Sequence, residues 1–109
     1  MTNETLETIK KRRSCRAYKP EQITDEELNA VLEAGTYAAS AMGRQSAKIV
    51  VVQDAATRAQ LTRMNAAVMG TNNDPMYAAP TILVVLADAN SKNAVQDGSL
   101  VMGNLMLAA

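Results

Sequence analysis

Histidine, tryptophan and phenylalanine are absent from this chain of 109 residues, and there is a single cysteine. Without histidine the chain lacks the commonest general base, the commonest metal ligand and every Ser-His or Cys-His nucleophile pair. The lone Cys15 can form no internal disulfide, which is compatible with a reducing cytoplasm. One cysteine and no histidine also exclude a structural zinc site, so we expect no metal.

Net charge and long apolar runs are lacking as well. Lys+Arg and Asp+Glu number 11 each, so no whole-chain field attracts nucleic acid. No apolar run approaches the ~18 residues of a membrane span, and the acidic N-terminus does not resemble a signal peptide. We therefore expect one cytoplasmic domain over residues 1–109, with no membrane and no nucleic-acid partner.

The spacing of apolar residues predicts six elements. Helices are expected at about 2–11, at 24–38 behind a Thr-x-x-Glu capping box, after Asp54 to at least residue 64, and from about 91–93 onward. Apolar runs predict strands at 48–53 and 81–87, each buried on both faces. Buried strands flanked by helices indicate a layered α/β or α+β domain.

The last predicted helix is apolar on all sides, and the sequence stops within it at Ala109. A helix with apolar residues all round is buried in its functional state. We expect either that the chain is a truncated piece of a longer domain or that a partner covers this helix. A homodimer joined through this helix is the favoured form, because Gly98 and Gly103 would allow two helices to approach closely.

Two segments carry residues suited to ligand binding. Residues 10–16 hold five cations around Ser14, which suits a phosphate, although a solvated basic helix end or a weak nucleic-acid contact would have the same composition. Residues 39–46 offer a hydroxyl, a guanidinium and an amide on a loop with Gly43, where an ordinary helix-to-strand connection is the alternative. A third segment, 74–80, is explained equally well by turn chemistry or as a pocket wall.

These segments together resemble the flavin-dependent nitroreductase family. The family's Arg-Arg-Ser-x-Arg motif corresponds to residues 12–16, and its Pro-x-Gln start of a capped acidic helix corresponds to residues 20–28. The Pro-Ser-x-x-Asn-x-Gln-Pro-Trp loop corresponds to residues 39–47, although only the Ser and the Gln are kept. Tyr-x-Ala-Pro corresponds to residues 77–80, and the Asp-x-Gly-x-x-x-x-Asn helix corresponds to residues 97–109.

The resemblance implies an α+β fold with helices around a mostly antiparallel sheet, here truncated at its C-terminus. It also implies FMN as the cofactor, NAD(P)H as the reductant and a nitroaromatic, quinone or similar acceptor, in a ping-pong cycle. Reductive dehalogenation or enoyl reduction on the same fold is the enzymatic alternative. A truncated, non-catalytic dimeric module and a small basic nucleic-acid-binding domain are the alternatives of other classes.

The resemblance also assigns roles to residues. Arg12, Arg13 and Ser14 would hold the FMN phosphate and ribityl chain, and Arg16 would lie by the N1/C2 carbonyl edge of the ring, where negative charge gathers on reduction. Four residues of the loop would reach the flavin from the opposite subunit: Ser40, Met42, Arg44 and Gln45. Tyr77 would line the substrate pocket. No side chain is expected to act as a catalytic residue, because the flavin carries the chemistry.

Overall fold

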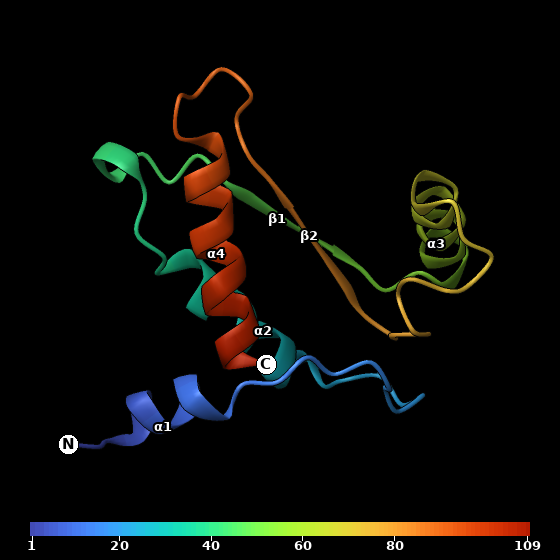
Figure 1. Ribbon diagram of the computed structural model, residues 1–109, viewed down its shortest axis with the longest axis horizontal. Helices are drawn as coiled ribbons and strands as arrows, with labels where there is room; N and C mark the ends of the chain where they lie inside the picture. Colours follow the sequence, from blue (N-terminus) through green and yellow to red (C-terminus); the bar gives the residue numbers. More distant parts are fainter. The chain divides into compact units, whose positions relative to one another are not determined.

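The computed structural model of the chain describes residues 1–109 and contains helices and two strands (Figure 1). In chain order the elements are α1 (Glu4–Lys11), α2 (Asp25–Thr36), the short 3-10 helix η1 (Ala41–Gly43), β1 (Lys48–Val52), α3 (Ala55–Met69), β2 (Ile82–Leu86) and α4 (Ala94–Ala108). The six elements predicted from the sequence are all present, and η1 lies within the loop predicted between α2 and β1.

Internal contacts divide the chain into two compact units, which are described separately. Unit 1 consists of Met1–Ser14, Thr24–Ile49 and Val85–Ala109. Unit 2 consists of Cys15–Ile23 and Val50–Val84. Each strand therefore contributes residues to both units.

Helix ends follow local side-chain chemistry. The Thr24 hydroxyl accepts the Glu27 N–H at 3.1 Å, and the Glu27 carboxylate accepts the Thr24 N–H at 2.8 Å, which confirms the predicted capping box. Asp54 caps α3 by accepting the Thr57 N–H at 2.9 Å. Gly70 ends α3 in the left-handed region, with φ of 68°, which glycine adopts without steric cost.

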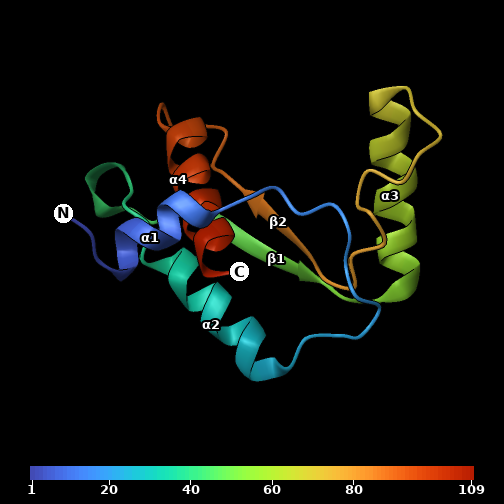
Figure 2. The ribbon, with the colours of Figure 1, turned by 60° about the horizontal axis from the view of Figure 1, so that its bottom comes forward.

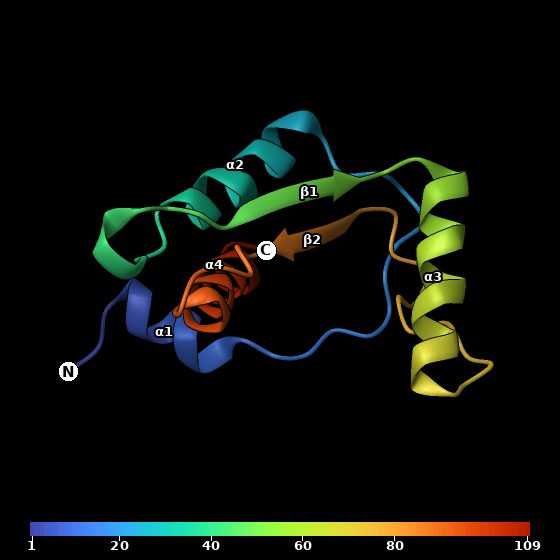
Figure 3. The ribbon, with the colours of Figure 1, turned by 90° about the horizontal axis from the view of Figure 1, so that it is seen from above.

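The two strands form an antiparallel pair, and their arrows point in opposite directions in Figure 3. The prediction that both faces of both strands are buried is wrong. Val50 in β1 is 42% exposed and Leu86 in β2 is 50% exposed, whereas Val52 and Ile82, on the same faces of the two strands, are buried. Burial therefore changes along one face of each strand, because a strand residue is covered only where another element packs over it.

The core of unit 1 lies between α2 and α4 (Figure 1). Gly35 of α2 is buried against Leu105 of α4, and a Cβ at Gly35 would come within 2.7 Å of Leu105 Cδ2 and 2.8 Å of Ile49 Cδ1. The Asn104 side chain donates to the Ala34 carbonyl at 2.9 Å. That carbonyl lies in the last turn of α2 and also accepts the Tyr37 N–H at 3.3 Å.

In unit 2 the loop that follows α3 turns back beside the helix (Figure 2). Arg58 holds this loop, because its guanidinium donates to the carbonyls of Gln53 at 3.1 Å and Ala79 at 3.2 Å. The Gln22 carboxamide donates to the Pro80 carbonyl at 2.8 Å, which attaches the segment 15–23 to the same loop.

Helix α4 is less buried than its apolar composition predicts. Leu105 and Asp97 are its buried residues, while Leu100, Met102 and Met106 are 48%, 40% and 50% exposed. Within the chain α4 therefore has a buried side facing α2 and an exposed side that carries Met102 and Met106. No helix in the structure has the length and apolar character needed to cross a membrane.

Candidate functional site

The basic segment begins where α1 ends. Arg12 is the C-cap of α1, with extended backbone angles, so the chain leaves the helix there. Arg13 donates from Nη1 to the carbonyls of Lys10 at 3.2 Å and Arg12 at 2.9 Å. The side chains of Arg12, Ser14 and Arg16 are exposed. An exposed hydroxyl among guanidinium groups can bind an anion through charge-assisted hydrogen bonds.

The loop between α2 and β1 is organised by its own hydrogen bonds. Ser40 Oγ accepts the Gln45 N–H at 2.9 Å, and the Ser40 carbonyl accepts the Gly43 N–H at 3.1 Å. The Arg44 guanidinium donates to Met42 Sδ at 3.6 Å. These contacts close a tight turn and leave the side chains of Met42, Arg44 and Gln45 exposed.

The same loop has an unusual backbone. Met42, Gly43 and Gln45 have φ of 53°, 63° and 49°, in the left-handed region. Gly43 occupies this region freely, whereas Met42 and Gln45 are strained there. Strained residues of this kind persist where the surrounding structure holds them, and they are concentrated at functional sites.

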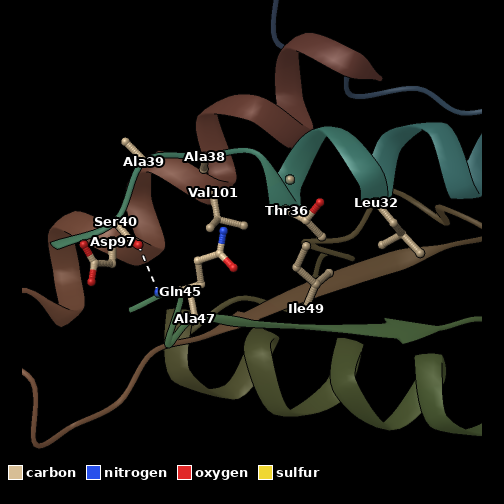
Figure 4. Close-up of a pocket in the computed structure, with 11 residues that line it drawn as sticks. Leu32, Thr36, Ala38, Ala39, Ser40, Gln45, Ala47, Ile49, Asp97 and Val101 are labelled. Atoms are coloured by element: carbon tan, nitrogen blue, oxygen red, sulfur yellow. Dashed lines mark hydrogen bonds between the residues drawn. The ribbon is translucent and has the colours of Figure 1, made fainter. Parts of the chain in front are cut away.

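Beneath the loop, unit 1 contains a pocket of about 320 Å³ (Figure 4). Its wall is mainly apolar, and Ser40, Gln45, Thr36 and Asp97 supply polar groups. The pocket is lined by Leu32, Gly35, Thr36, Ala38, Ala39, Ser40, Gln45, Ala47, Ile49, Asp97 and Val101. An apolar pocket with a few polar groups at this size is typical of small-molecule sites.

Asp97 is the buried acidic residue of the chain, at 4% exposure. Its Oδ1 accepts the backbone N–H of Ala41 at 2.9 Å, although the two residues are 56 positions apart. Asp97 lies in the first turn of α4, where the helix dipole favours a carboxylate. In the sequence Asp97 stands out only as part of a motif and as the single charged residue of α4.

The third segment lies in unit 2. Hydrogen bonds from the backbone N–H groups of Met76 and Ala78 hold the pKa of Asp74 below its usual range. Tyr77 and Ala78 have φ of 52° and 54°, so this loop is strained like the loop in unit 1. The pocket between this loop and α3 is lined by Met76 and Ala78, whereas Tyr77 is 44% exposed and not part of the wall.

The predicted site residues thus fall into separate groups. Ser40, Met42, Arg44 and Gln45 are brought together in one loop of unit 1. Arg12, Arg13 and Ser14 also belong to unit 1 but form no hydrogen bond with that loop, and Arg16 and Tyr77 belong to unit 2. The structure provides two sets of exposed polar groups in unit 1, one cationic and one mixed, each suited to binding a polar ligand.

Comparison with known proteins gives the family. The model of the nitroreductase family matches residues 9–75, a range that contains both the basic segment and the loop 39–46. A proposed NADH dehydrogenase/NAD(P)H nitroreductase of Archaeoglobus fulgidus is 35% identical over 97% of this chain and 61% of its own length.

Solved structures resemble the chain closely. A nitroreductase of Bacteroides fragilis with bound FMN has a TM-score of 0.86 and 35% identity, covering 99% of this chain and 65% of that protein. A nitroreductase of Desulfitobacterium hafniense with bound FMN has a TM-score of 0.88 and 31% identity, covering 100% of this chain and 65% of that protein. These matches confirm the predicted α+β nitroreductase-like fold, with helices and an antiparallel sheet.

The chain therefore spans about 61–65% of the length of these relatives. The family model covers more than half of the chain, and the relatives and the structures agree with it. The chain belongs to the nitroreductase family.

Proposed function

We propose that this chain forms the FMN-binding part of an NAD(P)H-dependent oxidoreductase that reduces nitroaromatic, quinone or similar acceptors. We treat residues 1–109 as part of one nitroreductase-like domain. The observation that carries the proposal is the match of the family model to residues 9–75, which include all the predicted cofactor-binding residues. The FMN found in the structures of two relatives supports the choice of cofactor.

The donor groups of the chain fit FMN. The phosphate needs charge-assisted donors, and Arg12 and Arg13 with the Ser14 hydroxyl offer them beside the end of α1. Arg16 would place positive charge at the pyrimidine edge of the ring. Bound FMN would supply the hydride and electron transfer that no side chain of this chain can supply.

The loop between α2 and β1 would supply neutral and cationic contacts to the cofactor of a second copy. Ser40, Met42, Arg44 and Gln45 are gathered there, and three of these side chains are exposed. The absence of hydrogen bonds between this loop and the basic segment is consistent with a site assembled from two subunits. The side chains that face solvent could then contact a partner's cofactor without rearrangement of the loop.

A second copy of the chain is the partner we propose. The exposed side of α4 carries Met102 and Met106, which are four residues apart and share one helix face, and exposed apolar residues on one face mark an interaction surface. The proposed location is the cytoplasm, because the single thiol of Cys15 is compatible with reducing conditions.

Absorption spectroscopy tests the proposed function. The protein would be purified with excess FMN, desalted and titrated anaerobically with NADH and with NADPH. We expect a yellow protein whose flavin absorption bleaches with at least one of the two nucleotides and returns when a quinone or nitroaromatic acceptor is added. A folded protein that retains no flavin in repeated titrations would contradict the proposal and favour a non-catalytic dimeric module.

Retention of flavin without bleaching would separate the two parts of the proposal. It would leave FMN binding intact and remove the role of NAD(P)H. Free FMN at the same concentration is the control for non-enzymatic reduction. Strong, salt-dependent retention on DNA in place of flavin binding would point to the nucleic-acid alternative.

A further inference from the structure

We propose that Asp97 is a positioning residue, whose carboxylate holds the loop of residues 40–46 in its strained, binding-competent conformation. The cofactor-binding part of this inference rests on the proposed function. The positioning of the loop stands on the geometry of unit 1 alone.

The first step is the burial of the carboxylate. Asp97 is 4% exposed and accepts the Ala41 N–H at 2.9 Å from another element of unit 1. Placing a carboxylate in a buried position is unfavourable unless hydrogen bonds compensate it. One turn further along α4 the residues next to Asp97 are the apolar Leu100 and Val101, so an apolar residue at position 97 would continue the helix face. The carboxylate therefore has a specific task, and the contact with Ala41 is the task that the structure shows.

The second step is the strain of the loop. Met42 and Gln45 hold left-handed backbone angles that their side chains disfavour. The hydrogen bonds from Gly43 and Gln45 to Ser40 join the loop to itself and would move with it. The bond from Ala41 to Asp97 differs, because it anchors the loop to α4 at the residue next to the strained Met42.

The third step is the position of α4 itself. Asn104, seven residues after Asp97, donates to the Ala34 carbonyl at 2.9 Å in the last turn of α2. One helix thus anchors the chain on both sides of the turn between α2 and η1. Figure 4 shows Asp97 beside Ser40 at the end of the pocket, where Gln45 also lies. Holding Ala41 in place therefore also holds its neighbours Ser40 and Met42, and with them the polar groups of the loop.

A purely structural role would have the same geometry but different consequences. Loss of a core contact lowers the stability of unit 1 as a whole, whereas loss of an anchor releases the loop and leaves α2 folded. Leu105→Ala is the matched control, because Leu105 is equally buried on α4 and contacts Gly35 of α2. Asp97→Asn is the conservative variant, because its amide oxygen can still accept the Ala41 N–H.

Amide hydrogen exchange by NMR is the first measurement. In the unsubstituted protein we expect the Ala41 amide to be protected. Asp97→Ala should lower that protection about ten- to a hundredfold, as expected for a charge-assisted bond, while the amides of α2 keep theirs. Asp97→Asn should restore most of the protection, and Leu105→Ala should lower protection across α2 and the loop together. Free exchange at Ala41 in the unsubstituted protein overturns the proposal, even if Asp97→Ala fails to fold.

FMN titration is the second measurement. Asp97→Ala should weaken FMN binding about tenfold or more, Asp97→Asn should remain within about threefold of the parent, and folded Leu105→Ala should bind like the parent. Equal FMN affinity of Asp97→Ala and a flavin-binding parent would overturn the positioning role. If the parent binds no FMN while Asp97→Ala still loses protection at Ala41, the proposed function fails and the anchoring of the loop stands.

Discussion

The contact of Gly35 with Leu105 makes a quantitative prediction about the core of unit 1. Gly35→Ala would place a Cβ 2.7 Å from Leu105 Cδ2 and 2.8 Å from Ile49 Cδ1, closer than carbon atoms approach. Alanine favours the helix by about 0.5–1 kcal/mol relative to glycine, but overpacking costs about 1–3 kcal/mol. We expect Gly35→Ala to lower the free energy of unfolding by up to about 2 kcal/mol.

Leu105→Ala alone should lower the free energy of unfolding by about 2–5 kcal/mol, because it leaves a cavity against α2. In that background the Leu105 atoms that crowd Gly35 are gone, and the Ile49 side chain can move into the vacated space. Gly35→Ala should then be neutral or stabilising. The two substitutions should therefore be coupled by about 1–3 kcal/mol.

Urea denaturation followed by circular dichroism, at one fixed protein concentration, measures the four free energies of this double-mutant cycle. Gly103→Ala is the control, because a Cβ there meets no atom within 4 Å on the same helix α4. It should stabilise by up to about 1 kcal/mol. An equal effect of Gly35→Ala with and without Leu105 would refute the packing described for α2 and α4.

Other predictions concern the cofactor and pH. Arg12→Ala should weaken FMN binding about ten- to a hundredfold, whereas Lys92→Ala, another exposed cation, should not; equal affinities in a flavin titration would refute the phosphate role. Arg16→Ala should lower the midpoint potential of bound flavin and have a smaller effect on FMN affinity, because its charge would stabilise the reduced ring. An unchanged midpoint potential would refute this role of Arg16. The pKa of Asp74 is lowered chiefly by the hydrogen bond from the Met76 N–H. The ionised Asp74 carboxylate therefore stabilises the folded state fully above the unfolded pKa of about 3.9. That stabilisation is lost as the pH falls through the lower folded pKa. Urea midpoints between pH 5 and pH 2 should therefore fall less in Asp74→Asn, and parallel curves would contradict this.

Features set by neighbouring residues could be predicted from the sequence. The capping box of Thr24 and Glu27 is confirmed because its donors and acceptors are three residues apart, so local geometry determines it. Gly43 indicates a turn for a similar reason, and its φ is positive. The strain at Met42 could not be predicted, since side chains disfavour that conformation and contacts elsewhere must maintain it.

Features that depend on residues far apart in the sequence either could not be predicted or were predicted wrongly. The contact between Asp97 and Ala41 joins residues 56 positions apart, and nothing in either local sequence identifies the other. Val50 was predicted to be buried from its β-branched neighbours, but it is 42% exposed while Val52 on the same face is buried, so burial depends on what packs over each position. The basic segment was identified because charge is visible in composition. The residues of the loop 39–46 were assigned to the same site through the family resemblance, because no spacing in the sequence connects them with the basic segment.

Helix α4 connects the two proposals made for this chain. One part of it anchors the loop through Asp97, and another part exposes Met102 and Met106, where a second copy would bind. A partner that binds only the folded helix stabilises it, and by linkage the loop that it anchors. FMN affinity should therefore rise with protein concentration and fall in Met106→Glu, which places a charge in the proposed interface. Light scattering coupled to size exclusion over the same dilution series gives the oligomeric state. FMN affinity that is constant while the protein passes from dimer to monomer would show that the helix does not couple the two sites.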